Sequence, residues 1–170
     1  TLSSSSAASD VYKRQILRKF ILADKKELIS LLNDETVTKW IELPYPYLEK
    51  HANWWLNTGS KEKHHYALIE ETNNKLVGSL KITVRGEIGC WIGREYWNKG
   101  YAFEAVERIK KFGFSELKLD KIWAATHKEN EAPQIVLKKC GFKSVGEKPY
   151  HVEGIGDTKI RPHFEITKSP

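Results

Sequence analysis

The sequence predicts an α+β protein in which a mixed, mostly antiparallel sheet of six or seven strands carries helices on both faces. Three observations support this class. Two helical patterns precede most of the strands, three strand patterns then follow one another directly, and a long periodic helix comes before a strand, a helix and two final strands. The 170 residues are 40% hydrophobic and show no internal repeat or linker, which indicates one globular domain.

The first half of the chain supplies two helices and four strands. Asp24 is a plausible N-cap for the first helix, which continues through Leu32. Residues 42–59 predict a proline-containing loop and a second helix that ends near Gly59. The turn "TNNK" joins two strands into a hairpin. The predicted strands are residues 16–21, 64–71, 76–84 and 87–93.

The second half begins with the strongest periodic pattern in the chain. Apolar residues recur at helical spacing from Ala102 to Phe112 and predict a helix over 102–117. Pro133 is suited to the first turn of a further helix near 132–140. Strands are expected at 121–126, near 141–149 and near 159–167.

Composition and charge exclude some classes of protein and leave others open. No apolar run approaches the roughly 18 residues that span a bilayer, so we expect a soluble protein without a membrane partner. The net charge of +6 and the pI near 9.2 suit nucleic acid, an anionic membrane or an acidic small molecule. Cys90 and Cys140 lack metal-ligand spacing, so we expect buried, reduced thiols in a cytoplasmic protein.

The first fifteen residues do not share the pattern of the rest. "TLSSSSAASDVYKRQ" is rich in Ser and Ala, and "DVYKRQ" resembles the translation of a transposon end used as a sequencing adapter. We therefore expect residues 1–15 to be a non-native or disordered extension and residues 16–170 to form a single domain. The chain contains no Met, which agrees with a reading frame truncated at its start.

The turn before the long helix carries the strongest functional signal. "EYWNKGYA" places Gly100 and Ala102 where a strand leads through a loop into a helix N-terminus. Small side chains let backbone N–H groups approach a ligand, the helix dipole adds partial positive charge, and Lys99 adds a full charge. The sequence therefore predicts an anion-binding site at this turn.

Five segments in a fixed order resemble the GCN5-related N-acetyltransferase (GNAT) superfamily, within it the RimJ/RimL-type branch that acetylates ribosomal-protein N-termini and similar amines. They are "ILRKF", "LPYPYLEKHANWWL", "VGSLKI", "EIGCWIGREYWNKGYAFEA" and "ENEAPQIVLKKCGFKSVG", and they extend over about residues 16–167. The resemblance implies the GNAT fold with a splay between the fourth and fifth strands. It also implies acetyl-CoA as co-substrate, with no metal.

The resemblance places coenzyme A on this loop and on the strand before it. The pyrophosphate motif falls on residues 97–102, with Trp97 at the usual Arg position and Asn98 where the branch usually has Gly. The pantetheine arm is expected to lie beside the preceding strand like an added strand. Asn130 matches a later branch motif, with helix capping as its alternative role. The implied cofactor-binding residues are Cys90, Trp91, Ile92, Trp97, Asn98, Lys99, Gly100, Tyr101, Ala102, Asn130 and Lys139.

Transfer of an acetyl group to an amine needs a group that accepts the amine's proton. Glu87, at the start of its strand and in phase with Trp91, is the first candidate base, with a solvated strand-end carboxylate as the alternative. His127, just beyond the strand at 121–126, is the weaker candidate, with a surface histidine as the alternative.

The acid that protonates the leaving thiolate is less well defined. Relatives have a serine where this chain has Pro133, so that hydroxyl is missing. Tyr101 and Tyr150 are the candidate acids near the expected cleft. No well-placed nucleophile suggests a covalent acyl-enzyme, so we expect direct attack in a ternary complex.

Aromatic residues in the early helices and their loop form the acceptor-side wall in relatives. Trp40, Tyr45, Tyr47 and Trp55 are therefore the expected substrate contacts, and core packing is the alternative for these residues and for Trp54. A ribosomal or other protein N-terminus is the favoured acceptor. A polyamine, an amino sugar and an antibiotic stay open.

Two other functions compete with acetyl transfer. A catalytically impaired acyl-CoA-binding module is plausible because of Pro133, and it would bind the thioester without transferring acetyl. A basic nucleic-acid binder would lose affinity steeply with salt, yet the chain has no helix-turn-helix, RNA-binding aromatic motif or zinc spacing. We expect acetyl-CoA and an amine as partners, no nucleic acid, and a monomer or homodimer.

Overall fold

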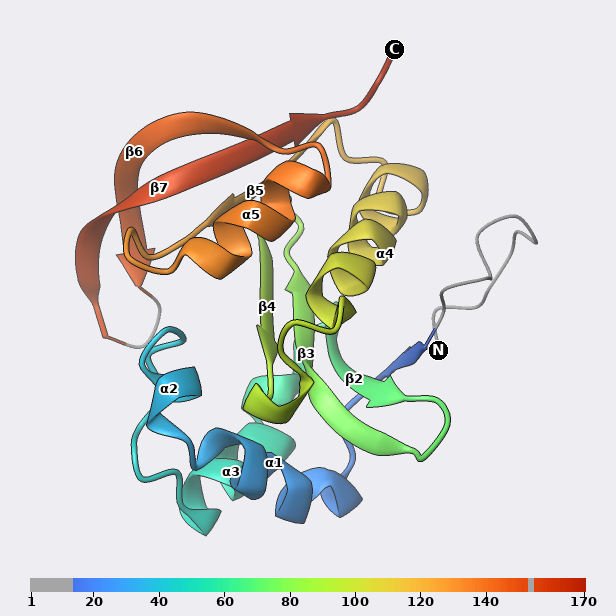
Figure 1. Cartoon of the computed structure of the whole chain (residues 1–170), viewed down its shortest axis with the longest axis vertical. Helices are drawn as coiled ribbons and strands as arrows, with labels where there is room; N and C mark the ends of the chain where they lie inside the picture. Colours follow the sequence, from blue (N-terminus) through green and yellow to red (C-terminus); the bar gives the residue numbers. More distant parts are fainter. Residues whose placement is uncertain (1–13, 153–154) are drawn as a thin grey trace. The chain divides into compact units, whose positions relative to one another are not determined.

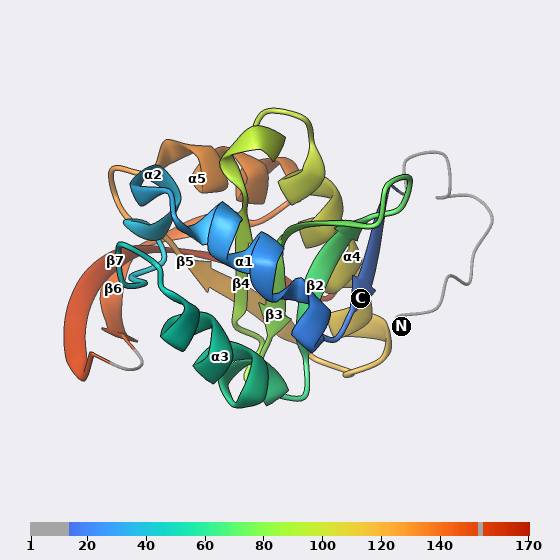
Figure 2. The same cartoon turned by 90° about the horizontal axis from the view of Figure 1, so that it is seen from below.

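The computed structural model describes residues 14–152 and 155–170 (Figures 1 and 2). These residues divide into two compact units. The first unit holds the described residues up to Lys81 together with Gly89–Ala105, and the second holds Ile82–Ile88 and the described residues from Val106 onward. Of the predicted extension, residues 1–13 lie outside the described part of the chain.

The elements follow the predicted order. The strands are β1 (Gln15–Arg18), β2 (His65–Glu70), β3 (Lys75–Ile82), β4 (Ile88–Ile92), β5 (Lys121–Ala125), β6 (Lys143–Val152) and β7 (Asp157–Thr167). The α-helices are α1 (Lys25–Leu32), α2 (Glu35–Thr38), α3 (Glu49–Asn57), α4 (Tyr101–Ser115) and α5 (Glu131–Lys139). Three 3₁₀ turns are η2 (Leu22–Asp24), η3 (Gly59–Lys61) and η4 (Arg94–Tyr96). The sequence did not predict α2 or these turns, because a single turn is too short to show a helical period.

The predicted α+β class is confirmed, and the seven strands lie in two sheets. The first sheet has the order β1-β2-β3-β4, and the second has the order β5-β7-β6 with antiparallel pairs. β4 and β5 are therefore terminal strands of different sheets. One isolated parallel bridge, between Glu87 and Trp123, joins β5 to the residue before β4 within the second unit.

The core of the first unit surrounds β2 and β3, which are buried along almost their whole length. α1 and α3 pack against each other (Figure 2). Gly78 fixes how closely the strands approach, because a Cβ there would lie 2.0 Å from the carbonyl oxygen of Trp91 in β4. Only glycine leaves room for that backbone contact.

The second unit packs one face of its sheet against helices. The even-numbered residues of β7, among them Phe164 and Ile166, lie on this face, and Lys138 of α5 lies over the Phe164 ring. On α4, a Cβ at Gly113 would lie 2.7 Å from Ile122 Cδ1, which shows how closely the helix approaches β5. The long β6–β7 hairpin extends beyond β5 and is bent (Figure 1).

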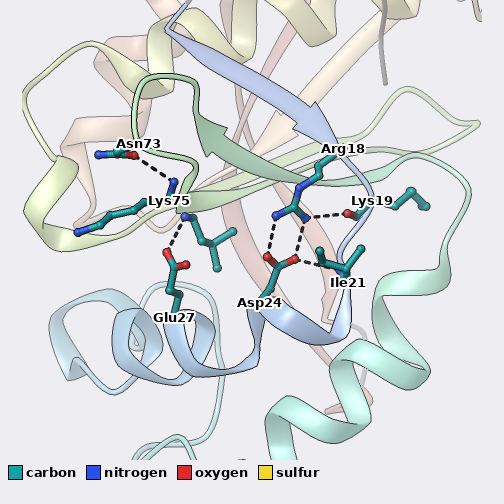
Figure 3. A network of polar contacts seen from close by, with 8 residues as sticks. Arg18, Lys19, Ile21, Asp24, Glu27, Asn73 and Lys75 are labelled. Carbon is teal, nitrogen blue, oxygen red and sulfur yellow. Dashed lines mark hydrogen bonds and ion pairs between the residues drawn. The ribbon is translucent and has the colours of Figure 1, made fainter.

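A bidentate ion pair between Arg18 and Asp24 connects β1 to the start of α1 (Figure 3). Arg18 donates from Nη1 to Asp24 Oδ2 at 2.8 Å and from Nη2 to Oδ1 at 2.7 Å. Asp24 Oδ2 also accepts from the Ile21 amide at 2.9 Å. Asp24 stands at the predicted N-cap position, but its side chain makes no capping bond to α1, because both oxygens point back toward β1.

We expect Asp24→Ala to destabilise the fold by about 3 kcal/mol, because it leaves a partly buried guanidinium without its carboxylate. Asp24 is only 4% exposed, so solvent screens the pair weakly. The surface ion pair of Lys25 with Glu49 offers a control, since Glu49→Ala should cost well under 1 kcal/mol. Urea unfolding measures the free energy of unfolding of both variants. Equal losses of stability would contradict a larger contribution from the Arg18–Asp24 pair than from the surface pair.

His65 is held neutral among aromatic rings. Its ring lies 4.6 Å from the Trp55 centroid and 6.4 Å from that of Phe20, and Nε2 lies 3.0 Å from Ser79 Oγ. Burial, together with the positive charges of Lys81 and Lys19, lowers the pKa of His65 to about 3. The folded protein therefore excludes a proton that the unfolded chain accepts with a pKa near 6.5.

The free energy of unfolding should fall as the pH drops from about 7 toward 5, because the unfolded state then binds a proton at His65 that the folded state rejects. His65→Gln should reduce this fall. His151→Gln, which changes an exposed histidine on β6, is the matched control and should leave the fall as it is. Urea unfolding at both pH values would contradict the assignment if His65→Gln and wild type lost stability equally.

Candidate active site

Two residues with a left-handed backbone conformation, Asn98 and Gly100, shape the turn that leads into α4. Asn98 has φ 58° and Gly100 has φ 82°, and the Glu104 amide donates to the Gly100 carbonyl at 3.1 Å. Gly100 is thus the residue at which the first helical hydrogen bond begins. Asn98 occupies its unusual conformation because asparagine tolerates positive φ better than most residues.

The amides of this turn are directed away from the protein's own acceptors. Among the described residues, none accepts a hydrogen bond from the backbone N–H of Asn98, Lys99, Gly100, Tyr101 or Ala102. Trp97 to Gly100 are exposed, and the Lys99 side chain adds a positive charge beside them. Unpaired N–H groups at the start of a 15-residue helix can bind an anion.

The opposite, carbonyl side of the turn is held by the start of β1. Arg14 Nη2 donates to the Lys99 carbonyl at 2.7 Å, and its guanidinium carbon lies 4.3 Å from the Tyr101 ring centroid. Gln15 Nε2 donates to the Tyr101 carbonyl at 3.0 Å. Gln15 is the first residue of β1 and lies opposite Glu70 of β2. β1 thus begins one residue before the predicted strand, and these two side chains fix the turn from behind.

Tyr101, one of the two candidate acids, is committed elsewhere. Its hydroxyl donates to Glu70 at the end of β2, and its ring is buried. Burial and the hydrogen bond to the Glu70 carboxylate raise the pKa of Tyr101 to about 12. Its phenol therefore braces the start of α4 against the first sheet.

Among the described strands, β4 pairs with β3 along one backbone edge and with no strand along the other. The Gly93 amide donates to the Val77 carbonyl at 2.8 Å, so by strand alternation Trp91 faces β3 while the backbone groups of Cys90 and Ile92 face the other edge. The Ile92 carbonyl accepts from Trp97 Nε1 at 2.7 Å. Of the three predicted pantetheine contacts, the Cys90 backbone and the Ile92 amide therefore suit an added strand best. Burial raises the pKa of the Cys90 thiol to about 12, which argues against a thiolate there.

The second unit brings Glu87 and Tyr150 together, although they lie far apart in the sequence. The Tyr150 hydroxyl donates to Glu87 Oε1 at 2.6 Å. Glu87 is fixed in turn by its amide, which donates to Thr83 Oγ1 at 3.1 Å, and by its bridge to Trp123. Both side chains are partly buried, so this is a short, oriented hydrogen bond between a candidate base and a candidate acid.

Three further side chains surround Tyr150. Trp123 and His163 are stacked with ring centroids 5.4 Å apart, and each meets the Tyr150 ring edge-on, at 6.4 and 6.2 Å. The guanidinium of Arg161 lies 5.1 Å from the Tyr150 ring centroid. Sequence analysis missed these three; the alternation of polar and apolar residues along 157–167 was the signal that could have placed Arg161 and His163 on one face.

The later motif of the chain is placed at the start and end of α5. Asn130 is the N-cap residue, but its side chain makes no capping hydrogen bond, and Lys139 ends the helix in an exposed position. Pro133 is the third helical residue, where its missing N–H has no helical partner to lose. The carbonyl of His127 accepts from the Asn130 amide at 3.1 Å, so its backbone shapes the turn before α5.

The four predicted substrate aromatics have different environments. Tyr47 is 3% exposed, and burial raises its pKa to about 12, so it belongs to the core. Trp55 packs on Phe20 and His65. Tyr45 is 53% exposed, and Trp40 lies under the ammonium of Lys39 at 4.5 Å. Tyr45 and Trp40 are thus the better placed to meet a ligand.

The described residues contain no group of three or more His, Cys, Asp and Glu side chains arranged to hold a metal ion. Over the same part of the chain, no helix combines the length and apolar character that crossing a bilayer requires.

The chain belongs to the acetyltransferase (GNAT) domain family, whose sequence model matches residues 14–143. It is 28% identical over 145 residues to the uncharacterized N-acetyltransferase p20 of Bacillus licheniformis, which covers 79% of this chain and 82% of that protein. It is 27% identical over 137 residues to the spermidine N(1)-acetyltransferase of Escherichia coli K12, covering 77% and 74%.

Solved structures share the fold. An acetyltransferase of the GNAT family from Bacillus anthracis aligns with a TM-score of 0.78 at 28% identity, covering 91% of this chain and 95% of that one. A protein assigned as a ribosomal-protein-serine acetyltransferase from Vibrio cholerae gives 0.77 at 21%, covering 93% and 96%. The spermidine N-acetyltransferase of Vibrio cholerae in complex with CoA and spermine gives 0.71 at 19%, covering 91% and 95%. The superfamily expected from the sequence is confirmed, and the chain is a GNAT acetyltransferase.

Gly100→Ala should weaken coenzyme A binding about tenfold, because a Cβ in a left-handed conformation costs roughly 1–2 kcal/mol and the turn must rearrange to relieve it. Gly146→Ala is the matched control, since Gly146 has φ 87° on β6 with nothing within 4 Å of an added Cβ. Both variants should lose similar stability, and only Gly100→Ala should lose affinity in calorimetric titration. Unchanged affinity in Gly100→Ala would remove the turn from the cofactor site.

Proposed function

We propose that this GNAT acetyltransferase uses acetyl-CoA to acetylate a primary amine, with a protein or peptide N-terminus as the acceptor, by direct attack. The observation that carries the proposal is the 2.6 Å hydrogen bond from the Tyr150 hydroxyl to Glu87 Oε1. It pairs a proton acceptor with a proton donor, and acetyl transfer to an amine requires both.

The residues around the turn before α4 fit the cofactor. Unpaired amides from Asn98 to Ala102 and the Lys99 ammonium suit a pyrophosphate, since each charge-assisted bond contributes roughly 1.5–3 kcal/mol. The Cys90 backbone and the Ile92 amide suit the amide groups of the pantetheine arm. Asn130 and Lys139 are further candidate contacts. When bound, acetyl-CoA supplies an acetyl group activated as a thioester.

Glu87 is proposed as the base. Its carboxylate accepts a hydrogen bond at Oε1, which leaves Oε2 to receive a proton from the amine, directly or through water. At pH 7, deprotonating an α-amino group of pKa near 8 costs about 1.4 kcal/mol, whereas a lysine amine costs about 4.6 kcal/mol. A carboxylate is a weak base, so it suits the α-amino group. This favours a peptide N-terminus over a lysine side chain.

Tyr150 is proposed as the acid, because Tyr101 is bound to Glu70 on the first sheet. The Tyr150 hydroxyl donates to Glu87, and the rings of Trp123 and His163 limit how far the phenol can turn. Such a phenol can replace the serine hydroxyl that Pro133 lacks. His127 is not needed for either role.

The rival function is an acyl-CoA-binding module without catalysis. Pro133 favours it, since no hydroxyl stands at that place in α5. The oriented Glu87–Tyr150 pair favours the enzyme, because a pure binding module has no need for an acid and a base in hydrogen-bond contact. A thiol-release assay with acetyl-CoA and a panel of peptides and small amines separates the two.

Glu87→Gln and Tyr150→Phe should each lower kcat by about 100-fold, since each removes a proton-transfer group. Tyr101→Phe is the matched control for loss of a phenol; it should lower stability and leave kcat within about threefold. The proposed roles fail if both variants keep wild-type kcat, and the binding-module rival gains support if wild type binds acetyl-CoA and acetylates no amine.

A further inference from the structure

Within the described part of the second unit, α4 and α5 approach the same face of the second sheet, since Gly113 of α4 meets Ile122 and Lys138 of α5 lies over Phe164. Along β7 the even positions carry Ile160, Pro162, Phe164 and Ile166, and α5 packs on this side, since Lys138 lies over Phe164. The odd positions point to the opposite face, as alternation in a strand requires. Residues directly opposite each other in an antiparallel pair share a face, so the register assigns members of β5 and β6 to this odd-position face as well.

The odd-position face carries more cations than carboxylates. Glu165 lies opposite both Trp123 and Lys143, and Arg161 lies opposite Lys148. Among the described residues, the face carries five cations, Lys121, Lys143, Lys148, Lys159 and Arg161, against three carboxylates, Asp157, Glu165 and Glu87, the last of which is bridged to Trp123 and bound by Tyr150. Glu165 is shared between Lys121, at 3.2 Å, and Lys148, at 3.4 Å, so one carboxylate serves two ammonium groups.

The proposed catalytic pair belongs to the same face. Tyr150 lies opposite Lys159, two residues beyond Lys148 on β6, and its hydroxyl holds Glu87. Arg161 is 8% exposed, and its guanidinium is held over the Tyr150 ring. A buried guanidinium is screened weakly by solvent, so Arg161 contributes to the electrostatic potential around Tyr150.

We propose that the acceptor is a peptide N-terminus followed by acidic residues, and that this cationic face excludes polyamines. The inference rests on the proposed function and deepens it. An acceptor must bring one amine to Glu87, while the rest of it lies among more cations than carboxylates. Carboxylates beside that amine are attracted there, whereas each further ammonium of a polyamine is repelled.

The test compares acceptors that share one amine and differ in charge. Peptides with the same N-terminal residue are followed by three Glu, three Gln or three Lys, and spermidine and free glutamate are assayed beside them. The acidic peptide should have a kcat/KM about tenfold above the neutral one, as expected for several weak surface attractions. This advantage should shrink as salt rises from 20 to ~300 mM, because the Debye length falls below ~10 Å.

The second part of the experiment reverses two charges on the odd-position face. Lys148→Glu combined with Lys159→Glu should cut the preference for the acidic peptide about tenfold. Lys118→Glu, an exposed position in the connection between α4 and β5, is the matched control and should leave the preference unchanged. Circular dichroism and urea unfolding establish that the double variant is folded; if it is not, Lys159→Gln alone replaces it, with about a threefold loss expected.

The outcomes separate this inference from the proposed function. Faster acetylation of spermidine or the Lys peptide, or a preference that the double variant retains, overturns the acidic acceptor. If free glutamate has the same kcat/KM as the acidic peptide, the inference that the acceptor is a peptide is wrong. If no amine is acetylated, the proposed function fails, and anisotropy with the fluorescent acidic peptide decides the inference: salt-sensitive binding lost in the double variant supports it, and absence of binding overturns it.

Discussion

The backbone of β4 imposes the constraint on which the rest of the architecture depends. Within the described residues, β4 is paired along one edge only, and there it approaches β3 so closely that Gly78 leaves no room for a side chain against the Trp91 carbonyl. The described strands form two sheets, and the Glu87–Trp123 bridge links β5 to the residue before β4. A strand with one unpaired edge can accept an extended ligand, which a fully paired central strand cannot do.

Each unit of the protein contains a separate part of the proposed chemistry. In the first unit, Arg14, Gln15 and Tyr101 hold the back of the turn before α4, so that its amides stay free of internal acceptors. In the second unit, Thr83 and the aromatic rings around Tyr150 hold the Glu87 pair. In both places the groups proposed to act are oriented by neighbouring side chains, which lowers the entropic cost of organising a site.

Overall similarity to known proteins does not identify the acceptor of this chain. The solved spermidine acetyltransferase and the protein assigned as a ribosomal-protein-serine acetyltransferase align almost equally well, so overall similarity leaves the acceptor open. The face of β5, β7 and β6 that bears Tyr150 carries more cations than carboxylates. Fold is conserved by packing, whereas acceptor choice depends on a few exposed charges, so similar backbones can serve acceptors of opposite charge.

The sequence by itself determined the order of elements, the α+β class, the turn at Gly100 and the candidates Glu87 and Tyr150, because period, glycine conformation and residue chemistry are local properties. Only the tertiary structure showed that Tyr101 is bound to Glu70 and Tyr150 to Glu87, that Arg161 and His163 lie beside Tyr150, and that Tyr47 is buried in the core. It also showed that Asp24, predicted as a helix cap, instead binds Arg18 through its side chain. Such choices depend on strand register and on contacts between residues far apart in the chain, which a local pattern does not encode.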